Sequence, residues 1–270
     1  MTAIGLAPIR SGAAWSAFFA LLRRDARVLW KTKIVFALRT IIQPLLTVFV
    51  FAYVFPKIGQ GIGGDNAMFA TLLAPGLIAV ALIFQGIQAV ALPLVQEFGY
   101  TREIEDRVMA PLPIWAIAVE KITSGAIQAF LAALVVLPFV YLIPSSPVHL
   151  TFHWLQVVTV VPLACILAGA LGLTIGTRVD VRQVPLLFSV IVVPMTFLGC
   201  SYYPWRALEA IRWLQIAVLI NPLVYMSEGL RMSMTTVPHM ATWGIYVALV
   251  GFVTGLSWLG ITGFRSRVVS

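Results

Sequence analysis

The sequence has few charged side chains: only 10% of its 270 residues are Asp, Glu, Lys or Arg, whereas 60% are hydrophobic. Soluble domains carry about 25% charged residues. A chain this poor in charge cannot cover a globule with polar side chains, so the composition excludes a soluble enzyme and a disordered chain. It predicts an all-α polytopic membrane protein.

Motifs for nucleotide binding and catalysis are also missing. The sequence contains no G-x-x-x-x-G-K-[ST], HExxH or GxSxG pattern. Its two cysteines, Cys165 and Cys200, provide neither a disulfide framework nor a metal cluster. The GQGIGG segment at 59–64 follows a dinucleotide-binding pattern, but it lies between two apolar runs, so we interpret it as a turn. We therefore expect no catalytic residue, no metal site and no cofactor in this chain.

Long apolar runs are abundant, and a helix needs about 20 apolar residues to cross the hydrocarbon of a membrane. We expect a cytoplasmic N-terminus over 1–33, six spans within 34–264 and a cytoplasmic tail over 265–270. The expected spans are about 34–55, 67–96, 113–143, 154–176, 183–200 and 242–264.

The segment 204–233 is ambiguous because its apolar run, Leu214–Ile220, has only seven residues. Asn221 and Pro222 follow this run. Proline interrupts a continuing helix but suits the first turn of a new one, for which Asn221 is a good N-cap. The segment therefore predicts a pair of external re-entrant helices before the last span.

The basic residues agree with this topology, since cytoplasmic loops are enriched in Lys and Arg. With six crossings, 14 basic residues fall inside and four outside. Those outside are Lys57, Arg206, Arg212 and Arg231. A single crossing by 204–233 would instead place the C-terminal arginines outside. We therefore expect a multi-pass protein of a bacterial cytoplasmic (inner) membrane with both termini inside.

Residues 13–31 predict an amphipathic helix on the cytoplasmic leaflet, because apolar and basic side chains recur on separate faces. A cleaved signal peptide is the alternative, but its apolar run would be short and no cleavage site is present. The net charge of +8 then indicates contact with membrane lipids and no binding of nucleic acid. The residues assigned to this helix are Trp15, Phe18, Phe19, Leu22, Arg23 and Arg27.

Several polar side chains lie within the expected spans, where burial without a partner is costly. Gln43 is in the first span, and Gln85 and Gln88 share a face of the second. Glu228 and Arg231, three residues apart, can form an ion pair. Such groups either form interhelical hydrogen bonds or line a translocation path, and the sequence leaves both possibilities open.

The loop 97–112 is the most charged segment, with four acids and two bases between Glu97 and Arg107. Thr101 is a plausible N-cap, and acids in the first turns of a helix interact favourably with its dipole. The loop is therefore either a solvated connection or a short surface helix that docks on a cytoplasmic partner.

At this point the chain resembles a known family. EFGYTRE at 97–103 with MAPLP at 109–113 is similar to the cytoplasmic signature of type-2 ABC exporter permeases. LGCSYYP at 198–204, INPLVY at 220–225 and EGLR at 228–231 resemble the pattern that precedes their last span. The group includes drug-resistance, nodulation-factor, O-antigen and teichoic-acid export permeases. One difference is that the family signature continues into a leucine-rich stretch, whereas this chain continues with charged residues.

The resemblance implies a second permease chain, as homodimer or heterodimer, and two copies of a cytoplasmic ABC ATPase that bind ATP and Mg. The loop 97–112 would hold the coupling helix. The residues assigned to coupling are Glu97, Arg102, Glu103 and Arg107. Those assigned to a path or gate are Gln43, Gln85, Gln88, Asn221, Glu228 and Arg231.

The leading hypothesis is therefore an exporter permease for an amphiphilic drug or lipid-like substrate, non-catalytic itself. Export of a lipid-linked polysaccharide or glycolipid by the same architecture is the alternative. Two hypotheses from other classes are a non-transporting assembly or sensor protein and a membrane-embedded enzyme. The enzyme would need paired polar residues of catalytic type at one depth, and none are evident in the sequence.

Overall fold

The computed structural model describes residues 11–58, 66–98, 112–179, 183, 186 and 188–269. The structure is all-helical, with 86% helix, and its described part contains no strand. The predicted all-α class is therefore confirmed.

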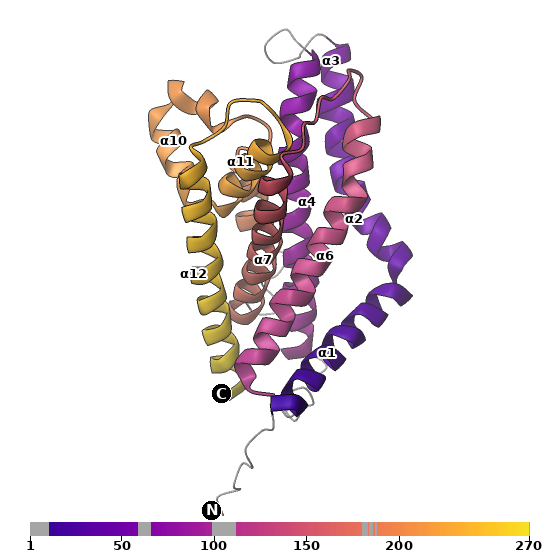
Figure 1. The fold of residues 1–270 in the computed structure, drawn as a ribbon, viewed down its shortest axis with the longest axis vertical. Helices are drawn as coiled ribbons and strands as arrows, with labels where there is room; N and C mark the ends of the chain where they lie inside the picture. The colour runs from indigo at the N-terminus through magenta and orange to yellow at the C-terminus, as the bar shows by residue number, and fades with distance from the viewer. Residues whose placement is uncertain are drawn as a thin grey trace, which may run out of the picture.

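Six long helices form the body of the molecule (Figure 1). They are α1 (Ser11–Lys31), α2 (Lys33–Val48), α4 (Asn66–Gln96), α6 (Ile114–Leu142), α7 (Trp154–Arg178) and α12 (Thr242–Val269). The shorter elements are η1 (Phe49–Val54), α3 (Phe55–Lys57), η4 (Phe188–Val192), α9 (Val193–Phe197), η5 (Trp205–Ala210), α10 (Arg212–Ala217), η6 (Val218–Ile220) and α11 (Pro222–Met234).

Among the described residues, five helices are long and apolar enough to cross a membrane. They cover Lys33–Val54, Met68–Gln96, Ile114–Leu142, Trp154–Arg178 and Thr242–Val268. Five of the six expected spans are thus confirmed as helices to within a few residues. The expected span at 183–200 corresponds to η4 and α9, whose described parts are short, so the sixth crossing stays a prediction.

Helix α4 lies at the centre of the bundle, and most of its apolar span is buried against its neighbours. It touches α7 at a seam of small residues, because a Cβ on Gly86 would lie 2.4 Å from the Cβ of Ala168. A Cβ on Gly172 would lie 2.7 Å from the carbonyl oxygen of Gly86. Only glycine permits this backbone approach, which is the usual way for membrane helices to pack closely.

Helices α7 and α12 run parallel. Near their starts, the hydroxyls of Thr159 and Tyr246 lie 2.6 Å apart. Near their ends, Arg267 donates a hydrogen bond to the carbonyl of Gly176 at 3.2 Å. The end of α7 and the start of α12 therefore lie at opposite ends of the bundle.

The bundle has two distinct ends, named here after one helix at each. At the α1 end, the rings of Phe98 and Phe264 meet at 5.9 Å and Phe18 of α1 packs against the same apolar cluster. At the α11 end, the amide of Thr151 donates to the carbonyl of Met234 at 2.9 Å. Figure 1 shows α10 and α11 at one end and the end of α12 at the other.

Helix α1 confirms the helix expected at 13–31 and runs obliquely beside α6 (Figure 1). Phe18 and Leu22 are half-buried. Trp15 and Phe19, by contrast, are 64% and 61% exposed. The basic side chains of Arg23 and Arg27 are exposed as well. This outer flank suits a membrane surface, and its location there stays a prediction.

Candidate functional site

The predicted break before α11 is present in the structure. The Asn221 side-chain oxygen accepts a hydrogen bond from the Leu223 amide at 3.0 Å, so Asn221 caps the helix as expected. Its side-chain nitrogen also donates to the carbonyl of Met195 at 2.7 Å. Asn221 therefore ties the start of α11 to the segment that contains α9.

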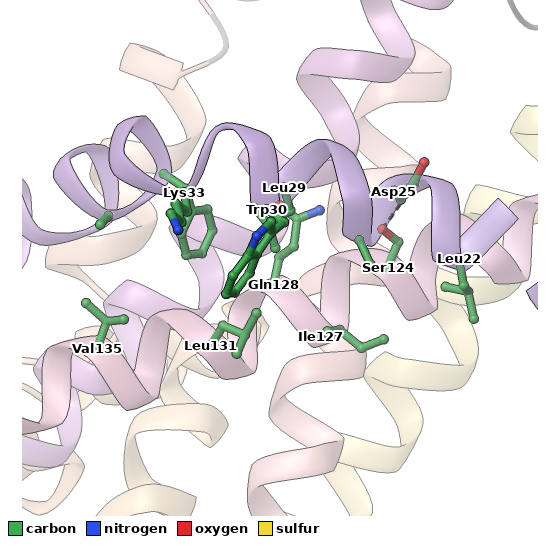
Figure 2. Close-up of a pocket in the computed structure, with 13 residues that line it drawn as sticks. Leu22, Asp25, Leu29, Trp30, Lys33, Ser124, Ile127, Gln128, Leu131 and Val135 are labelled. Atoms are coloured by element: carbon green, nitrogen blue, oxygen red, sulfur yellow. Dashed lines mark hydrogen bonds between the residues drawn. The ribbon is translucent and has the colours of Figure 1, made fainter. Parts of the chain in front are cut away.

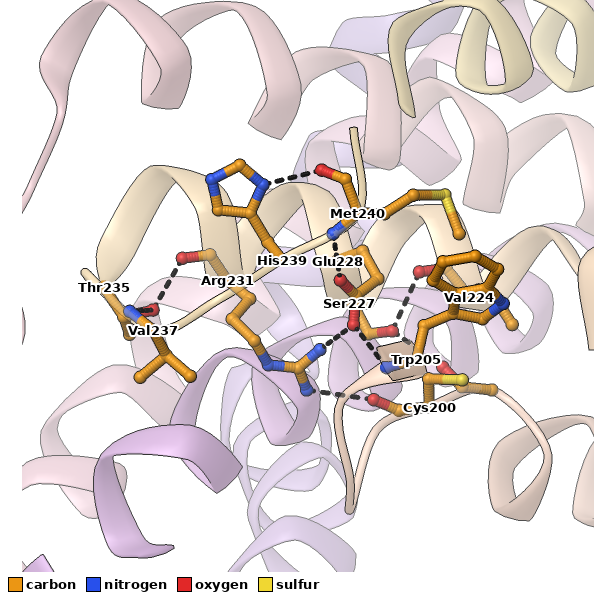
Figure 3. A network of polar contacts seen from close by, with 11 residues as sticks. Cys200, Trp205, Val224, Ser227, Glu228, Arg231, Thr235, Val237, His239 and Met240 are labelled. Atoms are coloured by element: carbon orange, nitrogen blue, oxygen red, sulfur yellow. Dashed lines mark hydrogen bonds and ion pairs between the residues drawn. The ribbon is translucent and has the colours of Figure 1, made fainter. Parts of the chain in front are cut away.

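A buried network that we call the clamp holds α11 in place (Figure 3). The predicted ion pair between Glu228 and Arg231 forms, and both side chains are fully buried. Glu228 Oε1 also accepts from the Trp205 amide at 2.9 Å, and its Oε2 accepts from the Met240 amide at 2.8 Å. Arg231 Nη2 donates to the carbonyl of Cys200 at 2.9 Å.

The clamp joins α11 to residues 200–205, which precede it, and to Met240, which follows it. Cys200 has a φ of 52°, in the left-handed region that is unfavourable for residues other than glycine. The bond from Arg231 to its carbonyl therefore stabilises a strained turn. Because Glu228 and Arg231 have no exposed surface and bind three segments of the protein, this geometry is that of a structural tie, although Arg231 Nε is buried without a partner among the described residues. Their assignment to a gate stays a prediction.

The α1 end is built differently, since two cavities flank the elbow at which α1 meets α2. One, of about 300 Å³, is partly polar and lies between the elbow and α4. The path candidates Gln85 and Gln88 line this cavity together with the coupling candidate Glu97. The structure thus brings together residues that the sequence analysis assigned to two separate roles.

The polar groups in this cavity are only partly satisfied by the protein. Gln85 accepts a hydrogen bond from the hydroxyl of Thr40 at 3.1 Å. The side-chain oxygen of Gln88 is buried and has no hydrogen-bond partner among the described residues. A buried amide oxygen without a partner costs free energy, and a bound polar group would recover it.

At the end of α4, Glu97 forms an ion pair with Lys121 of α6 at 3.0 Å, and their side chains are only 8% and 5% exposed. This pair fixes the point at which the loop 97–112 leaves the bundle. The pair therefore connects Glu97, one of the residues assigned to coupling, to the wall of the polar cavity.

The second cavity, of about 480 Å³, lies between α1, α2 and α6 and is mainly apolar (Figure 2). Lys33 lies over the ring of Trp30 at 4.4 Å from the ring centroid. Ser124 donates a hydrogen bond to Asp25 at 3.1 Å and thereby attaches α1 to α6.

Some of the assigned residues cannot be placed. Arg102, Glu103 and Arg107 lie outside the described residues, and Gln43 lies in α2 but its side chain is not described. Conversely, the sequence analysis did not identify Lys121 as a partner of Glu97.

It also missed Trp205 and Met240, which hold Glu228 through their backbone amides. No side-chain pattern in the sequence signals a contact made by the backbone.

An all-helical chain with several membrane-spanning helices and a partly polar cavity between them is a multi-pass membrane protein of the transporter type. The family model of the ABC-2 type transporter matches residues 16–235. Because the match covers well over half of the chain, this protein belongs to the ABC-2 type transporter family. No curated protein matches the chain.

Membership confirms the family suggested by the sequence motifs. It makes the chain a transmembrane component of an ABC transporter, a class that is generally non-catalytic. The family also implies association with an ABC ATPase subunit, and its members typically form dimers.

Proposed function

We propose that this chain is the permease subunit of an ATP-driven exporter that moves an amphiphilic drug or lipid-like substrate out across the cytoplasmic membrane. The polar cavity beside α4 is the observation that carries this proposal. Gln85 and Gln88 line it at one level, and Glu97 lines it where the loop 97–112 begins. A movement of this loop would therefore act directly on the cavity.

The coupling runs through the Glu97–Lys121 pair. Two cytoplasmic ATPase subunits bind ATP and Mg, and their closure displaces the loop 97–112, in which Arg102, Glu103 and Arg107 contact the ATPase. Because Glu97 is paired with α6, displacement of the loop shifts the end of α4 against α6. Two packings of these helices, biased by nucleotide in the partner, then give the cavity two shapes.

Substrate binds where the cavity leaves a polar atom unpaired. The Gln88 oxygen accepts a hydrogen bond from the polar part of the substrate. The apolar part of the substrate lies among the aliphatic side chains of the cavity. A second permease chain, identical or different, completes the path.

The membrane topology has six crossings, with the α1 end in the cytoplasm. The parallel course of α7 and α12 supports a sixth crossing, because the end of α7 and the start of α12 lie at opposite ends of the bundle. Basic side chains also support this orientation. Exposed lysines and arginines at the α1 end include Arg23, Arg24, Arg27, Lys31, Lys33 and Arg178.

One aromatic cluster at the α11 end packs within the protein and gives no path for a lipid-linked glycan. A glycan path needs free aromatic faces. Here the ring of Tyr202 stacks on Phe51 at 5.1 Å and packs against Phe197 at 5.7 Å. These rings contact one another, so they act as packing between η1 and the segment after α9.

The first experiment is purification of the tagged protein from its native membrane in mild detergent, with mass spectrometry of its partners. We expect a stoichiometric partner that carries a phosphate-binding loop. A homogeneous protein without an ATPase in several detergents would contradict the exporter and favour a sensor or assembly protein.

The coupling is tested in the reconstituted complex with Glu103→Lys. We expect lower transport and lower substrate-stimulated ATP hydrolysis while the complex stays assembled. Glu209→Lys is the matched control, because it makes the same charge change at an exposed position of η5 at the other end. Unchanged coupling in Glu103→Lys would remove this residue from the mechanism.

Topology is tested by thiol labelling in a Cys200→Ser background. A cysteine introduced by Arg206→Cys should react with an impermeant reagent from outside only. One introduced by Arg178→Cys, exposed at the end of α7, should react from inside only. Labelling of both from one side would exclude the six-span topology.

A further inference from the structure

The two cavities at the elbow of α1 and α2 share part of their walls. The residues that line both of them are Asp25, Leu29, Phe36 and Gln128. With volumes of about 300 and about 480 Å³, each cavity lies in the size range of small-molecule sites. The partly polar cavity beside α4 and the apolar cavity beside α6 are therefore adjacent, and these shared residues form the boundary between them.

Gln128 is the amide at this boundary. It lies at the middle of α6, between Ser124 and Leu131 (Figure 2), and its side chain makes no hydrogen bond to a described residue. Gln88 of α4 lines the same polar cavity, and its buried oxygen has no partner among the described residues. Polar side chains within membrane-spanning helices are costly without partners, so two such amides around one cavity indicate a site for a polar group.

The charged side chains that line the polar cavity balance one another. Two are basic and two are acidic: Arg24, Lys121, Asp25 and Glu97. Glu97 is paired with Lys121 at 3.0 Å. Asp25 accepts a hydrogen bond from Ser124 at 3.1 Å. A charged head group would find no surplus counter-charge here, so the loss of its hydration would not be compensated. An uncharged head group can exchange hydrogen bonds with the amide side chains, because an amide both donates and accepts.

The apolar cavity suits the tail of the same molecule. Leu29 and Phe36 lie at the boundary, and Ile127 and Leu131 of α6 line the cavity beyond it. Side chains of this kind give an apolar tail many dispersion contacts. The lining therefore changes from polar to apolar across the boundary, as an amphiphile does along its length.

We propose that one amphiphile with an uncharged head bearing hydroxyl or amide groups occupies both cavities. Its head lies at Gln88 and Gln128, and its tail lies between Leu29 and Leu131. This inference rests on the proposed function and extends its substrate site, because it names the class of head group and makes Gln128 a specificity-determining residue. Cationic and anionic amphiphiles are the competing occupants.

The chain offers two matched pairs of variants. Gln128→Leu removes the amide at the boundary. Gln156→Leu is its control, because Gln156 of α7 lines neither cavity and its oxygen is also buried without a partner among the described residues. Leu131→Trp fills the apolar cavity. Leu134→Trp adds the same side chain on the same helix at a position that is 51% exposed and does not line it.

Binding is measured on the full-length protein in phosphatidylcholine nanodiscs by photolabelling with a dodecyl glucoside that carries a diazirine in its tail. Labelled peptides are mapped by mass spectrometry. The competitors are unlabelled dodecyl glucoside, dodecyltrimethylammonium and dodecyl sulfate, each below the concentration that disperses the bilayer. We expect saturable labelling around Ile127 and Leu131, for which the glucoside competes best.

Gln128→Leu should weaken binding of the glucoside about five-fold, the factor that corresponds to one net hydrogen bond. Gln156→Leu should bind as the unmodified protein does. Gln128→Glu should shift the preference toward dodecyltrimethylammonium, a change that a purely structural role of Gln128 would not produce. Leu131→Trp should abolish labelling of the apolar cavity, and Leu134→Trp should retain it.

Equal or stronger competition by either charged amphiphile in the unmodified protein would overturn the proposal. So would equal effects of Gln128→Leu and Gln156→Leu, or labelling that persists in Leu131→Trp. A failure of the exporter hypothesis is a separate result, because it would be seen as the absence of an ATPase partner, whereas the labelling needs neither an ATPase nor ATP.

Discussion

The two ends of the bundle surround their buried polar side chains differently. At the α11 end, Glu228 accepts bonds from Arg231 and from two backbone amides and has no exposed surface. At the α1 end, two cavities flank the elbow, and the oxygen of Gln88 is buried without a partner among the described residues. Both ends keep a buried polar atom without a partner among the described residues, Arg231 Nε at one and the Gln88 oxygen at the other, but only the α1 end has cavities of several hundred Å³ beside such an atom.

This difference indicates which end of the bundle can move. An ion pair buried with several hydrogen bonds cannot open without exposing charge to a low-dielectric interior, so the clamp has one stable arrangement. The contacts at the elbow include a cation–π contact and a part-buried hydrogen bond. These are weaker, and they allow α1 to shift against α6 when a partner or ligand changes.

The largest expected effect is at the clamp. Arg231→Met leaves Glu228 as a buried charge without its counter-ion, which should destabilise the protein by about 3–5 kcal/mol. We expect a marked fall in the unfolding temperature in detergent. Adding Glu228→Gln should recover part of the loss. A destabilisation no larger than that of Arg212→Ala, at an exposed position of the same end, would contradict the clamp.

A smaller loss of stability is expected when the Glu97–Lys121 pair, which joins the end of α4 to α6, is broken. Lys121→Met removes the partner of Glu97, and a hydrogen bond to a charged group contributes about 1.5–3 kcal/mol. Because this pair is also the proposed coupling contact, substrate-stimulated ATP hydrolysis should fall more than basal hydrolysis. Equal falls in both activities would show that the pair is only structural.

At the start of α11, Asn221→Ala should cost about 0.5–2 kcal/mol, as expected for loss of an N-cap. Asn221→Ser keeps a capping oxygen but loses the bond to Met195, so it should be less destabilised than the alanine variant. Denaturant unfolding of both proteins in the same detergent measures the difference. Identical stabilities would mean that the cap contributes nothing.

The smallest effect is expected at the elbow. Ser124→Ala removes the bond to Asp25 and should cost about 0.5–1.5 kcal/mol at most, because the contact is part-buried. Global unfolding should change less than in Arg231→Met, while proteolysis within α1 should become faster. A global loss as large as that of Arg231→Met would erase the distinction between the two ends.

Much of the fold follows from sequence patterns that are local. The apolar runs give five spanning helices to within a few residues, and Asn221 followed by Pro222 marks the start of α11. The Glu228–Arg231 pair was also predictable, since residues three apart on a helix are neighbours. In each case the relevant groups lie within one helical turn or one run.

Contacts between distant segments were not predictable in the same way. Nothing in the spacing of Lys121 identifies Glu97, 24 residues earlier, as its partner. The bond between Ser124 and Asp25 joins residues 99 positions apart. The seam at Gly86 and Gly172 depends on which helices become neighbours, and that arrangement is a property of the whole bundle.

The sequence by itself determined that this is a helical membrane protein, where its helices lie and which family its motifs resemble, because hydrophobicity, capping and short motifs act within a segment. The tertiary structure alone decided that the polar side chains divide into a buried clamp at one end and cavities at the other. That division depends on which helices pack together, and packing is set by the fit of all surfaces at once.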